Sequence, residues 1–94
     1  MDKIERKRER IEIIYDILRI VEDNKNSIKP TPLLRYSNLS TKNFNEYIND
    51  LKEKKLLKEV LDKKGKKYFT LTDNGFGYIE KYKYIKGFIK EFNL

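Results

Sequence analysis

Hydrophobic residues recur at helical spacing near the start of the chain. From about residue 3 to residue 23 they fall every three or four positions along two stripes: Ile11, Ile14, Leu18 and Val21 on one, and Ile13, Ile17 and Ile20 on the other. This spacing predicts an α-helix. Because the helix is apolar on two sides, it must also be covered on two sides.

The pattern changes after residue 23 and predicts a loop followed by a short helix. The run "EDNKNS" breaks the helical spacing, and "SIK" at 27–29 is a candidate short strand. Thr31 suits an N-cap, and Pro32 suits the first helical position, where its missing N–H has no helical partner. A helix is therefore expected from Pro32 to about Ser37.

A second capped helix is predicted directly after a tight turn. Asn38 tolerates the left-handed conformation that such a turn needs, and Ser40 can cap a helix from Thr41 to about Lys54. One face of this helix carries the apolar side chains, which are Phe44, Tyr47, Ile48 and Leu51.

The residues after 54 change to strand character and predict a hairpin. "LLKEVLD" and "KYFTL" flank "KKGKK", where Gly65 can supply the positive φ of the turn. The tip of this hairpin carries a group of lysines.

A long helix is predicted from Asp73 to about Phe92, with Thr72 as its N-cap. At about 100° per residue, one narrow seam contains Tyr78, Tyr82, Ile85, Ile89 and Phe92. A coiled-coil contact with a second chain would cover the outer part of this seam. The alternative is a helix folded back on the first helix, over Ile13 and Ile20, and the two uses can coexist. Gly87 lies inside the helix at a cost of up to about 1 kcal/mol relative to alanine, unless close helix approach or a bend compensates.

The 94 residues are enough for one small folded unit and too few for two independent cores. The predicted class is mainly α with a small β-hairpin. We expect a folded domain over residues 1–72 and a dimerisation helix over residues 73–94.

The net charge of +7 favours a polyanionic partner, and nucleic acid is the first candidate. The charge is unevenly placed: segment 56–72 has five lysines against two acidic residues, whereas 11–40 has four charges of each sign. Positive potential is therefore expected to peak at the hairpin.

The chain has no cysteine and no histidine, which removes thiolate nucleophiles, imidazole bases and the common zinc sites. We therefore expect no enzyme, no metal and no cofactor. No apolar run approaches the roughly 18 residues of a membrane span, and the start lacks the apolar core of a signal peptide. A cytoplasmic protein is expected, with no membrane or small-molecule partner evident.

The helix at 41–54 turns its polar side chains away from the apolar face. Asparagine can both donate to and accept from adenine edges, and lysine can reach guanine or phosphate, so such a helix could read the major groove. Glu46 opposes phosphate but can accept from cytosine. An ordinary solvated face is the alternative interpretation.

Two short helices, a tight turn between them and a basic hairpin after them give the order of a winged helix-turn-helix. The hairpin lysines would lie beside the DNA backbone or in the minor groove, although lysines also protect strand edges from aggregation. Residues at the start of the first short helix could contact phosphates. The candidate DNA-binding residues are Lys29, Thr31, Arg35, Ser40, Thr41, Lys42, Asn43, Asn45, Glu46, Asn49, Lys63, Lys64, Lys66 and Lys67.

The basic residues of the N-terminus alternate with acids, so their expected role is ion pairing within the first helix rather than DNA contact. These residues are Arg6, Lys7, Arg8 and Arg10, interleaved with Glu5 and Glu9.

Three segments point to a known family: "IYDIL", "KPTPLLRYSNLSTKNFNEYINDLKEKKLL" and "KYFTLTDNGFGYIEKYKYIKGFI". Through them, nearly the whole chain resembles the archaeal winged helix-turn-helix proteins of the small basic ten-kilodalton type. The resemblance implies an antiparallel coiled-coil homodimer with a double-stranded-DNA-binding domain at each end. It places the dimer interface at Tyr78, Tyr82, Ile85, Ile89 and Phe92. Tyr84, Phe88, Gly77 and Gly87 depart from a plain seam.

Two other functions remain open at this point. Winged helices also serve as protein-docking modules without DNA binding, and fold alone does not fix function. RNA binding could follow from charge, although no aromatic stacking platform is evident.

Overall fold

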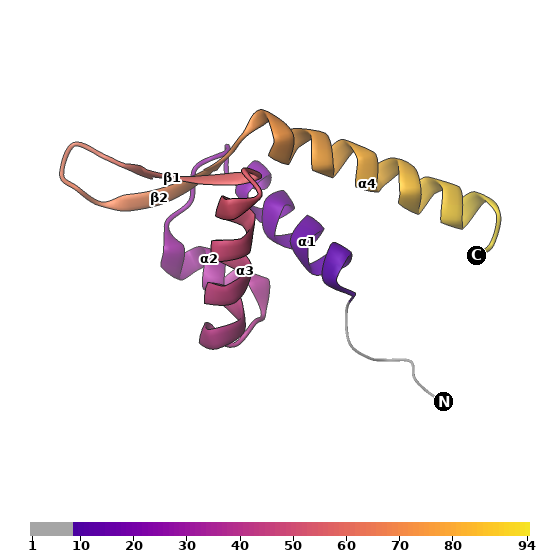
Figure 1. Cartoon of the computed structure of the whole chain (residues 1–94), viewed down its shortest axis with the longest axis horizontal. Helices are drawn as coiled ribbons and strands as arrows, with labels where there is room; N and C mark the ends of the chain where they lie inside the picture. The colour runs from indigo at the N-terminus through magenta and orange to yellow at the C-terminus, as the bar shows by residue number, and fades with distance from the viewer. Residues whose placement is uncertain (1–8) are drawn as a thin grey trace.

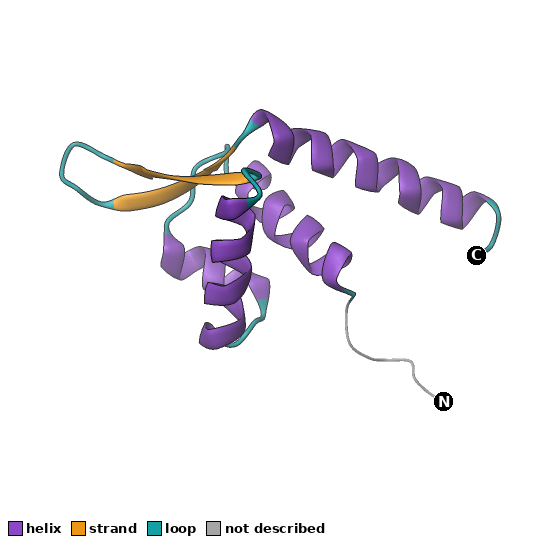
Figure 2. Cartoon of the chain, in the orientation of Figure 1, coloured by secondary structure: helices purple, strands orange, loops and turns teal. Residues whose placement is uncertain are grey.

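The computed structural model describes residues 9–94 as four helices and one β-hairpin (Figures 1 and 2). The elements in chain order are α1 (Arg10–Asp23), α2 (Pro30–Ser37), α3 (Thr41–Glu53), β1 (Leu57–Leu61), β2 (Lys67–Leu71) and α4 (Asp73–Glu91). The predicted class, mainly α with a small hairpin, is confirmed. The order of elements is that of a winged helix with an additional long final helix.

One core joins all of these elements. Leu18, Val21, Leu33 and Leu51 are completely enclosed. The remaining core side chains come from α1, the segment before α2, α3, the hairpin and the first half of α4, and they are Ile14, Ile17, Ile28, Phe44, Ile48, Leu57, Phe69, Leu71 and Ile79. Both predicted stripes of α1 therefore contribute to the core, as a helix covered on two sides requires.

The first two helices begin at different residues from those expected. α1 begins at Arg10 and has Glu9 as an N-cap in extended backbone, and the earlier part of the predicted helix lies outside the described residues. α2 begins at Pro30, and its N-cap is Lys29 with no side-chain hydrogen bond, so the prediction of Thr31 as the cap is wrong. Pro30 explains the earlier start, because its ring presets the helical φ and it has no N–H to satisfy.

The turn and cap between α2 and α3 are confirmed. Asn38 adopts the left-handed conformation with φ 60°. The Ser40 hydroxyl then accepts a hydrogen bond from the Asn43 backbone N–H at 3.1 Å, which starts α3. Local side-chain chemistry thus fixes where the outward face of α3 begins.

The hairpin pairs β1 and β2 in antiparallel register, with Leu57 opposite Leu71 and Leu61 opposite Lys67. Gly65 has φ 81° in its turn, as predicted. The candidate strand at 27–29 forms a single bridge, in which Ile28 and Phe69 exchange backbone hydrogen bonds of 3.2 and 2.8 Å. This bridge attaches the segment before α2 to the base of the hairpin.

α4 starts at a crowded point and ends in the open. The Thr72 hydroxyl accepts from the Gly75 N–H at 3.0 Å and donates to the Lys55 carbonyl at 2.6 Å. Gly75 is buried, and a Cβ at this position would overlap the Leu56 carbonyl oxygen. From there α4 runs away from the domain, and the molecule measures 49 × 27 × 22 Å (Figure 1).

Candidate nucleic-acid interface

The outward face of α3 is free of the protein's own packing. Phe44, Ile48 and Leu51 enter the core and Tyr47 is half-buried. The polar residues that sequence analysis placed on the other side, which are Ser40, Thr41, Lys42, Asn43, Asn45, Glu46 and Asn49, are all exposed. The first two turns of α3 therefore present hydroxyl, amide and ammonium groups to solvent.

The tip of the hairpin, residues 62–67, is held in shape by Asp62. One carboxylate oxygen of Asp62 accepts hydrogen bonds from the backbone N–H groups of Lys64 and Lys66, both at 2.8 Å. The Asp62 carbonyl accepts from the Gly65 N–H at 3.0 Å. A side chain that sequence analysis counted only as an opposing charge therefore shapes the turn that carries the lysines.

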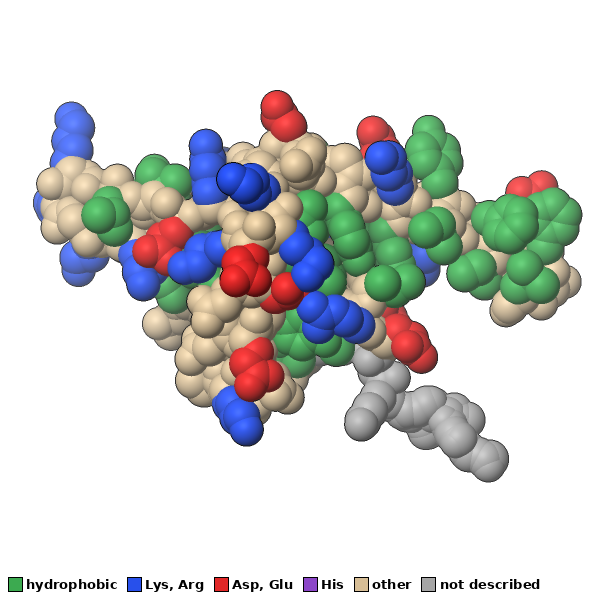
Figure 3. All heavy atoms as spheres, viewed as in Figure 1, with side chains coloured by type: hydrophobic (Ala, Val, Ile, Leu, Met, Phe, Trp, Pro, Cys, Tyr) green, Lys and Arg blue, Asp and Glu red, His purple; other side chains and the backbone are tan. Residues whose placement is uncertain are grey.

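Three of the four predicted tip lysines project from this turn. Lys63, Lys64 and Lys66 are exposed, and no described residue forms an ion pair with them. Lys67 lies in β2, where its Nζ is 3.8 Å from Glu59. In the space-filling view, blue side chains gather around the hairpin end of the molecule (Figure 3).

Glu59 joins the last turn of α3 to the hairpin. One of its carboxylate oxygens accepts from Lys52 Nζ at 3.0 Å, and the other lies near Lys67. The hydrogen bond from Lys52 is the main cause that lowers the pKa of Glu59 below its ordinary value. The Lys52–Glu59 ion pair thus links α3 to the hairpin, although each surface pair contributes little stability.

Lys29 lies next to the hairpin tip although it is more than thirty residues away in sequence. One open cleft of about 520 Å³ is lined by Lys29, Asp62, Lys63, Lys64 and Lys66. Four of these five residues are cationic, and the Asp62 carboxylate is occupied by backbone donors. The structure therefore brings the N-cap of α2 together with the tip.

The other two candidates on α2 are also exposed. Thr31 lies in the first turn of the helix, one residue after Pro30. The guanidinium carbon of Arg35 lies 5.6 Å from the centre of the Tyr36 ring. All fourteen predicted contact residues are thus accessible, and they come from α2, α3 and the hairpin.

Among the described residues, Arg10 pairs with α3 rather than within α1 as the sequence suggested. Its guanidinium forms an ion pair with Asp50 on α3 and lies 5.4 Å from the Tyr47 ring centre. Asp50 also accepts from Lys54 Nζ at 2.6 Å, and this hydrogen bond is the main cause that lowers the pKa of Asp50. The other N-terminal basic residues lie outside the described residues.

The predicted seam of α4 divides into two parts. The Tyr78 hydroxyl donates to the Ile11 carbonyl of α1 at 2.6 Å, and the Tyr82 ring lies 4.4 Å from that of Tyr15. Burial raises the pKa of both Tyr78 and Tyr82. The alternative of a helix packed on α1 thus holds for these two residues, through Ile11 and Tyr15.

The rest of the seam is open. Ile85, Ile89 and Phe92 are 48%, 42% and 58% exposed, with Tyr84 and Phe88 beside them. A narrow apolar groove of about 150 Å³, lined by Ile11, Tyr78, Lys81, Tyr82 and Ile85, marks where the packed part gives way to the open part. Figure 3 shows hydrophobic side chains along this outer end.

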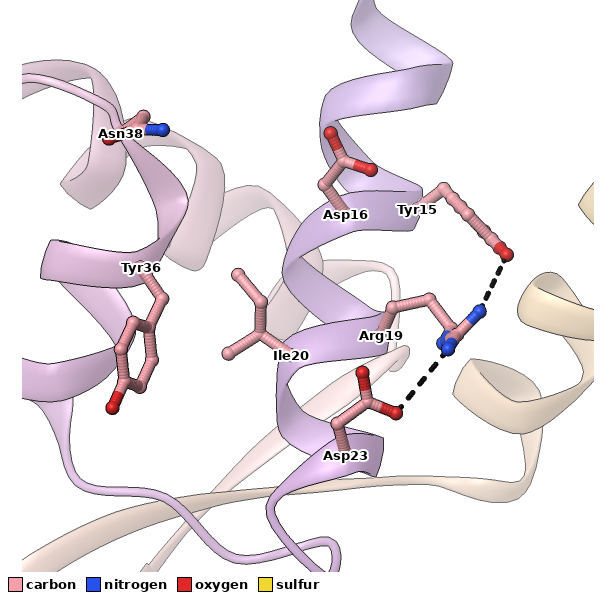
Figure 4. A pocket seen from close by; sticks show the side chains of 7 residues that line it. All are labelled: Tyr15, Asp16, Arg19, Ile20, Asp23, Tyr36 and Asn38. Atoms are coloured by element: carbon pink, nitrogen blue, oxygen red, sulfur yellow. Dashed lines mark hydrogen bonds and ion pairs between the residues drawn. The ribbon is translucent and has the colours of Figure 1, made fainter.

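A separate cleft of about 420 Å³ lies between α1 and α2 (Figure 4). Its one cation, Arg19, donates to the Tyr15 hydroxyl at 3.0 Å and to Asp23 at 3.4 Å. Asp16, Asp23 and Arg19 leave this cleft without excess positive charge. It therefore does not extend the basic surface.

The described residues hold no group of three or more acidic side chains placed to bind a metal ion. Over the same residues, no helix is long and apolar enough to span a membrane.

Comparisons with solved structures give the same fold. F93 from STIV, described as a winged-helix DNA-binding protein, superposes with a TM-score of 0.70 at 24% identity over 84% of this chain and 90% of that one. Sso10a-2, a DNA-binding protein from Sulfolobus solfataricus, gives 0.69 at 19% identity over 92% and 90%. MepR, a transcription regulator from Staphylococcus aureus, gives 0.73 at 15% identity over 84% and 59%.

No curated protein sequence matches the chain. A family model described as winged helix-turn-helix matches residues 7–90, which is nearly the whole length. The resemblance seen in the sequence is therefore confirmed for family and fold, and the chain belongs to the winged helix-turn-helix family.

Proposed function

We propose that this protein binds double-stranded DNA, with α3 in the major groove and the hairpin tip against the backbone or minor groove. The observation that carries the proposal is the cationic cleft between Lys29 and the tip. It brings together two segments that lie far apart in the sequence, the N-cap of α2 and the hairpin tip. Unpaired lysines at such a surface would release counterions from DNA on binding.

The polar face of α3 supports a contact with base edges. Asn43, Asn45 and Asn49 are exposed on the first turns of the helix, and their amides can pair with adenine. F93 and Sso10a-2, which share this fold, are both described as DNA-binding proteins. A role as a transcriptional regulator or as a chromatin-associated protein of the cytoplasmic nucleoid is consistent with this surface.

We also propose that the protein acts as a homodimer joined along α4 as an antiparallel coiled coil. Residues 73–94 would then form the dimerisation helix and residues 1–72 the DNA-binding domain. The exposed Ile85, Ile89 and Phe92 continue the line of Tyr78 and Tyr82, and a second copy would cover them. Light scattering should give twice the mass of one chain, and the mass of a single chain at micromolar concentration would contradict this.

The DNA proposal is tested by a salt titration on duplex DNA. The logarithm of the association constant should fall with the logarithm of salt concentration, with a slope of about −0.9 for each phosphate neutralised. Replacing Lys63, Lys64 and Lys66 by glutamine should weaken binding to all sequences and flatten the slope. Replacing Asn43 and Asn49 by alanine should change affinity only for a preferred sequence.

Gel shifts on random and genomic duplexes separate DNA binding from protein docking. Retardation at low salt that is lost in the lysine variant supports DNA binding. No retardation at all at low salt would contradict it and would favour a docking module for an acidic protein. A genome-wide occupancy map would then distinguish a regulator, with a few sharp peaks, from a chromatin protein with broad coverage.

A further inference from the structure

The outer part of α4 carries a second concentration of positive charge. Residues 81–90, "KYKYIKGFIK", contain four lysines and no acidic residue. Lys81, Lys83, Lys86 and Lys90 are all exposed, and no described residue forms an ion pair with any of them. By contrast, Lys52, Lys54 and Lys67 all have acidic partners.

Three of these lysines form a row on one side of the helix. At about 100° per residue, Lys83, Lys86 and Lys90 fall within an arc of about 60° beside the apolar seam, and they span about 10 Å of helix axis. Lys81 lies on the opposite flank. Like charges three and four residues apart destabilise a helix slightly, and attraction to the helix C-terminus would offset this cost for Lys90 alone.

The symmetry of the proposed dimer doubles this row. In an antiparallel pair, the two-fold axis keeps each flank of the helix on its own side of the pair, so the lysine rows of both copies lie together. The opposite flank carries Lys81, and Glu91 lies on the side of the helix away from the seam. One flank of the pair therefore gathers six lysines, three from each copy.

We propose that the row of Lys83, Lys86 and Lys90 is a second DNA-binding surface, which contacts the phosphate backbone of a duplex. The inference rests on the proposed dimer and adds a contact outside α3 and the hairpin. B-DNA carries one negative charge per about 1.7 Å of helix axis, so a row of this length can meet several phosphates. Phosphates would also relieve the repulsion between the two rows.

The test compares three variants of the full chain by fluorescence anisotropy on one duplex over a range of salt concentrations. The row variant replaces Lys83, Lys86 and Lys90 by glutamine, which is also a good helix former. The hairpin variant replaces Lys63, Lys64 and Lys66 in the same way. A control with equal charge loss replaces Lys25, Lys55 and Lys58, which are exposed and unpaired among the described residues.

The row variant should keep the dimer mass, bind more weakly than the control, and have a log–log salt slope that is flatter by at least about 2. Identical slopes for the row variant and the control would overturn the inference. If the hairpin variant still lost affinity in that case, the proposed function would stand without it. Wild-type protein that failed to bind any duplex would overturn both.

Vesicles of anionic phospholipid provide a further comparison, because a helix with an aromatic face and flanking lysines can also lie on a membrane surface. Wild-type protein should not float with such vesicles more than the row variant does. If the row variant alone failed to float with the vesicles, and its salt slope for DNA binding equalled that of the control, the row would be assigned to a lipid surface. That result would overturn the DNA contact.

Discussion

The two halves of α4 carry similar apolar residues but have different surroundings. In the inner half, residues 73–82, Gly75 and Ile79 are buried and two tyrosines contact α1. In the outer half, residues 83–91, no side chain is buried, although Ile85, Phe88 and Ile89 are as apolar as the inner residues. Helical periodicity thus identifies an apolar face, but the surroundings decide whether its own chain covers it.

The largest expected effect lies at the tightest contact of the inner half. Gly75→Ala would force a methyl group against the Leu56 carbonyl, and we expect the free energy of unfolding to fall by about 3 kcal/mol. Urea denaturation measures this loss. The matched control is Gly77→Ala, where an added Cβ meets nothing within 4 Å. Equal stability of the two variants would contradict the packing described for the inner half.

A charge in the outer half should separate the two copies. Ile89→Glu would place a carboxylate in the proposed interface of each chain, and burying an unpaired charge costs several kcal/mol. We expect dimer association to weaken by at least about 100-fold, measured by light scattering over a dilution series. Circular dichroism should remain that of the folded chain, because Ile89 lies outside the core.

The control for that experiment is Leu61→Glu, which also replaces an exposed aliphatic side chain but lies on β1. It should leave the dimer mass unchanged. If Ile89→Glu also kept the wild-type mass at every dilution, the outer half would not be the interface.

A smaller effect is expected from the hydrogen bond between α4 and α1. Tyr78→Phe removes the donor to the Ile11 carbonyl and should reduce the free energy of unfolding by about 1 kcal/mol. Tyr84→Phe, at a side chain that is 76% exposed, should change stability little. An equal loss in both variants would mean that the contact with α1 adds nothing to the inner half.

The smallest effect should have the opposite sign. Gly87 lies on the side of α4 away from the seam, and an added Cβ there meets nothing within 4 Å. Close helix approach therefore does not explain this glycine, and Gly87→Ala should stabilise the chain by up to about 1 kcal/mol in thermal unfolding. Gly65→Ala is the matched contrast, since its φ of 81° strains alanine and should lower stability.

Elements with local signals were predictable from the sequence. Ser40 and Thr72 are N-caps, Asn38 and Gly65 adopt the positive φ expected of them, and the strands flank the basic turn. The start of α2 was mistaken because Pro30 and Pro32 are two residues apart and either can open a helix. The local sequence around each proline is compatible with a helix start, so it gave no reason to prefer Pro30.

The parts of the site that were missed depend on contacts between distant residues. Arg10 pairs with Asp50, forty residues later, so helical spacing near Arg10 could not reveal its partner. Lys52 and Glu59 meet because the hairpin turns back beside α3. The neighbourhood of Lys29 and the hairpin tip likewise follows from the bridge of Ile28 to Phe69, for which the sequence offered only a short strand signal.

The Asp62 turn has a consequence for the affinity with which the hairpin tip could bind a duplex. Because the carboxylate already accepts hydrogen bonds from the backbone of Lys64 and Lys66, the tip would meet a duplex as an ordered turn rather than as a mobile loop. Little conformational freedom then remains to be lost on docking, and preorganisation of this kind increases affinity without any added contact. An acidic residue amid lysines can thus favour the capture of an anion.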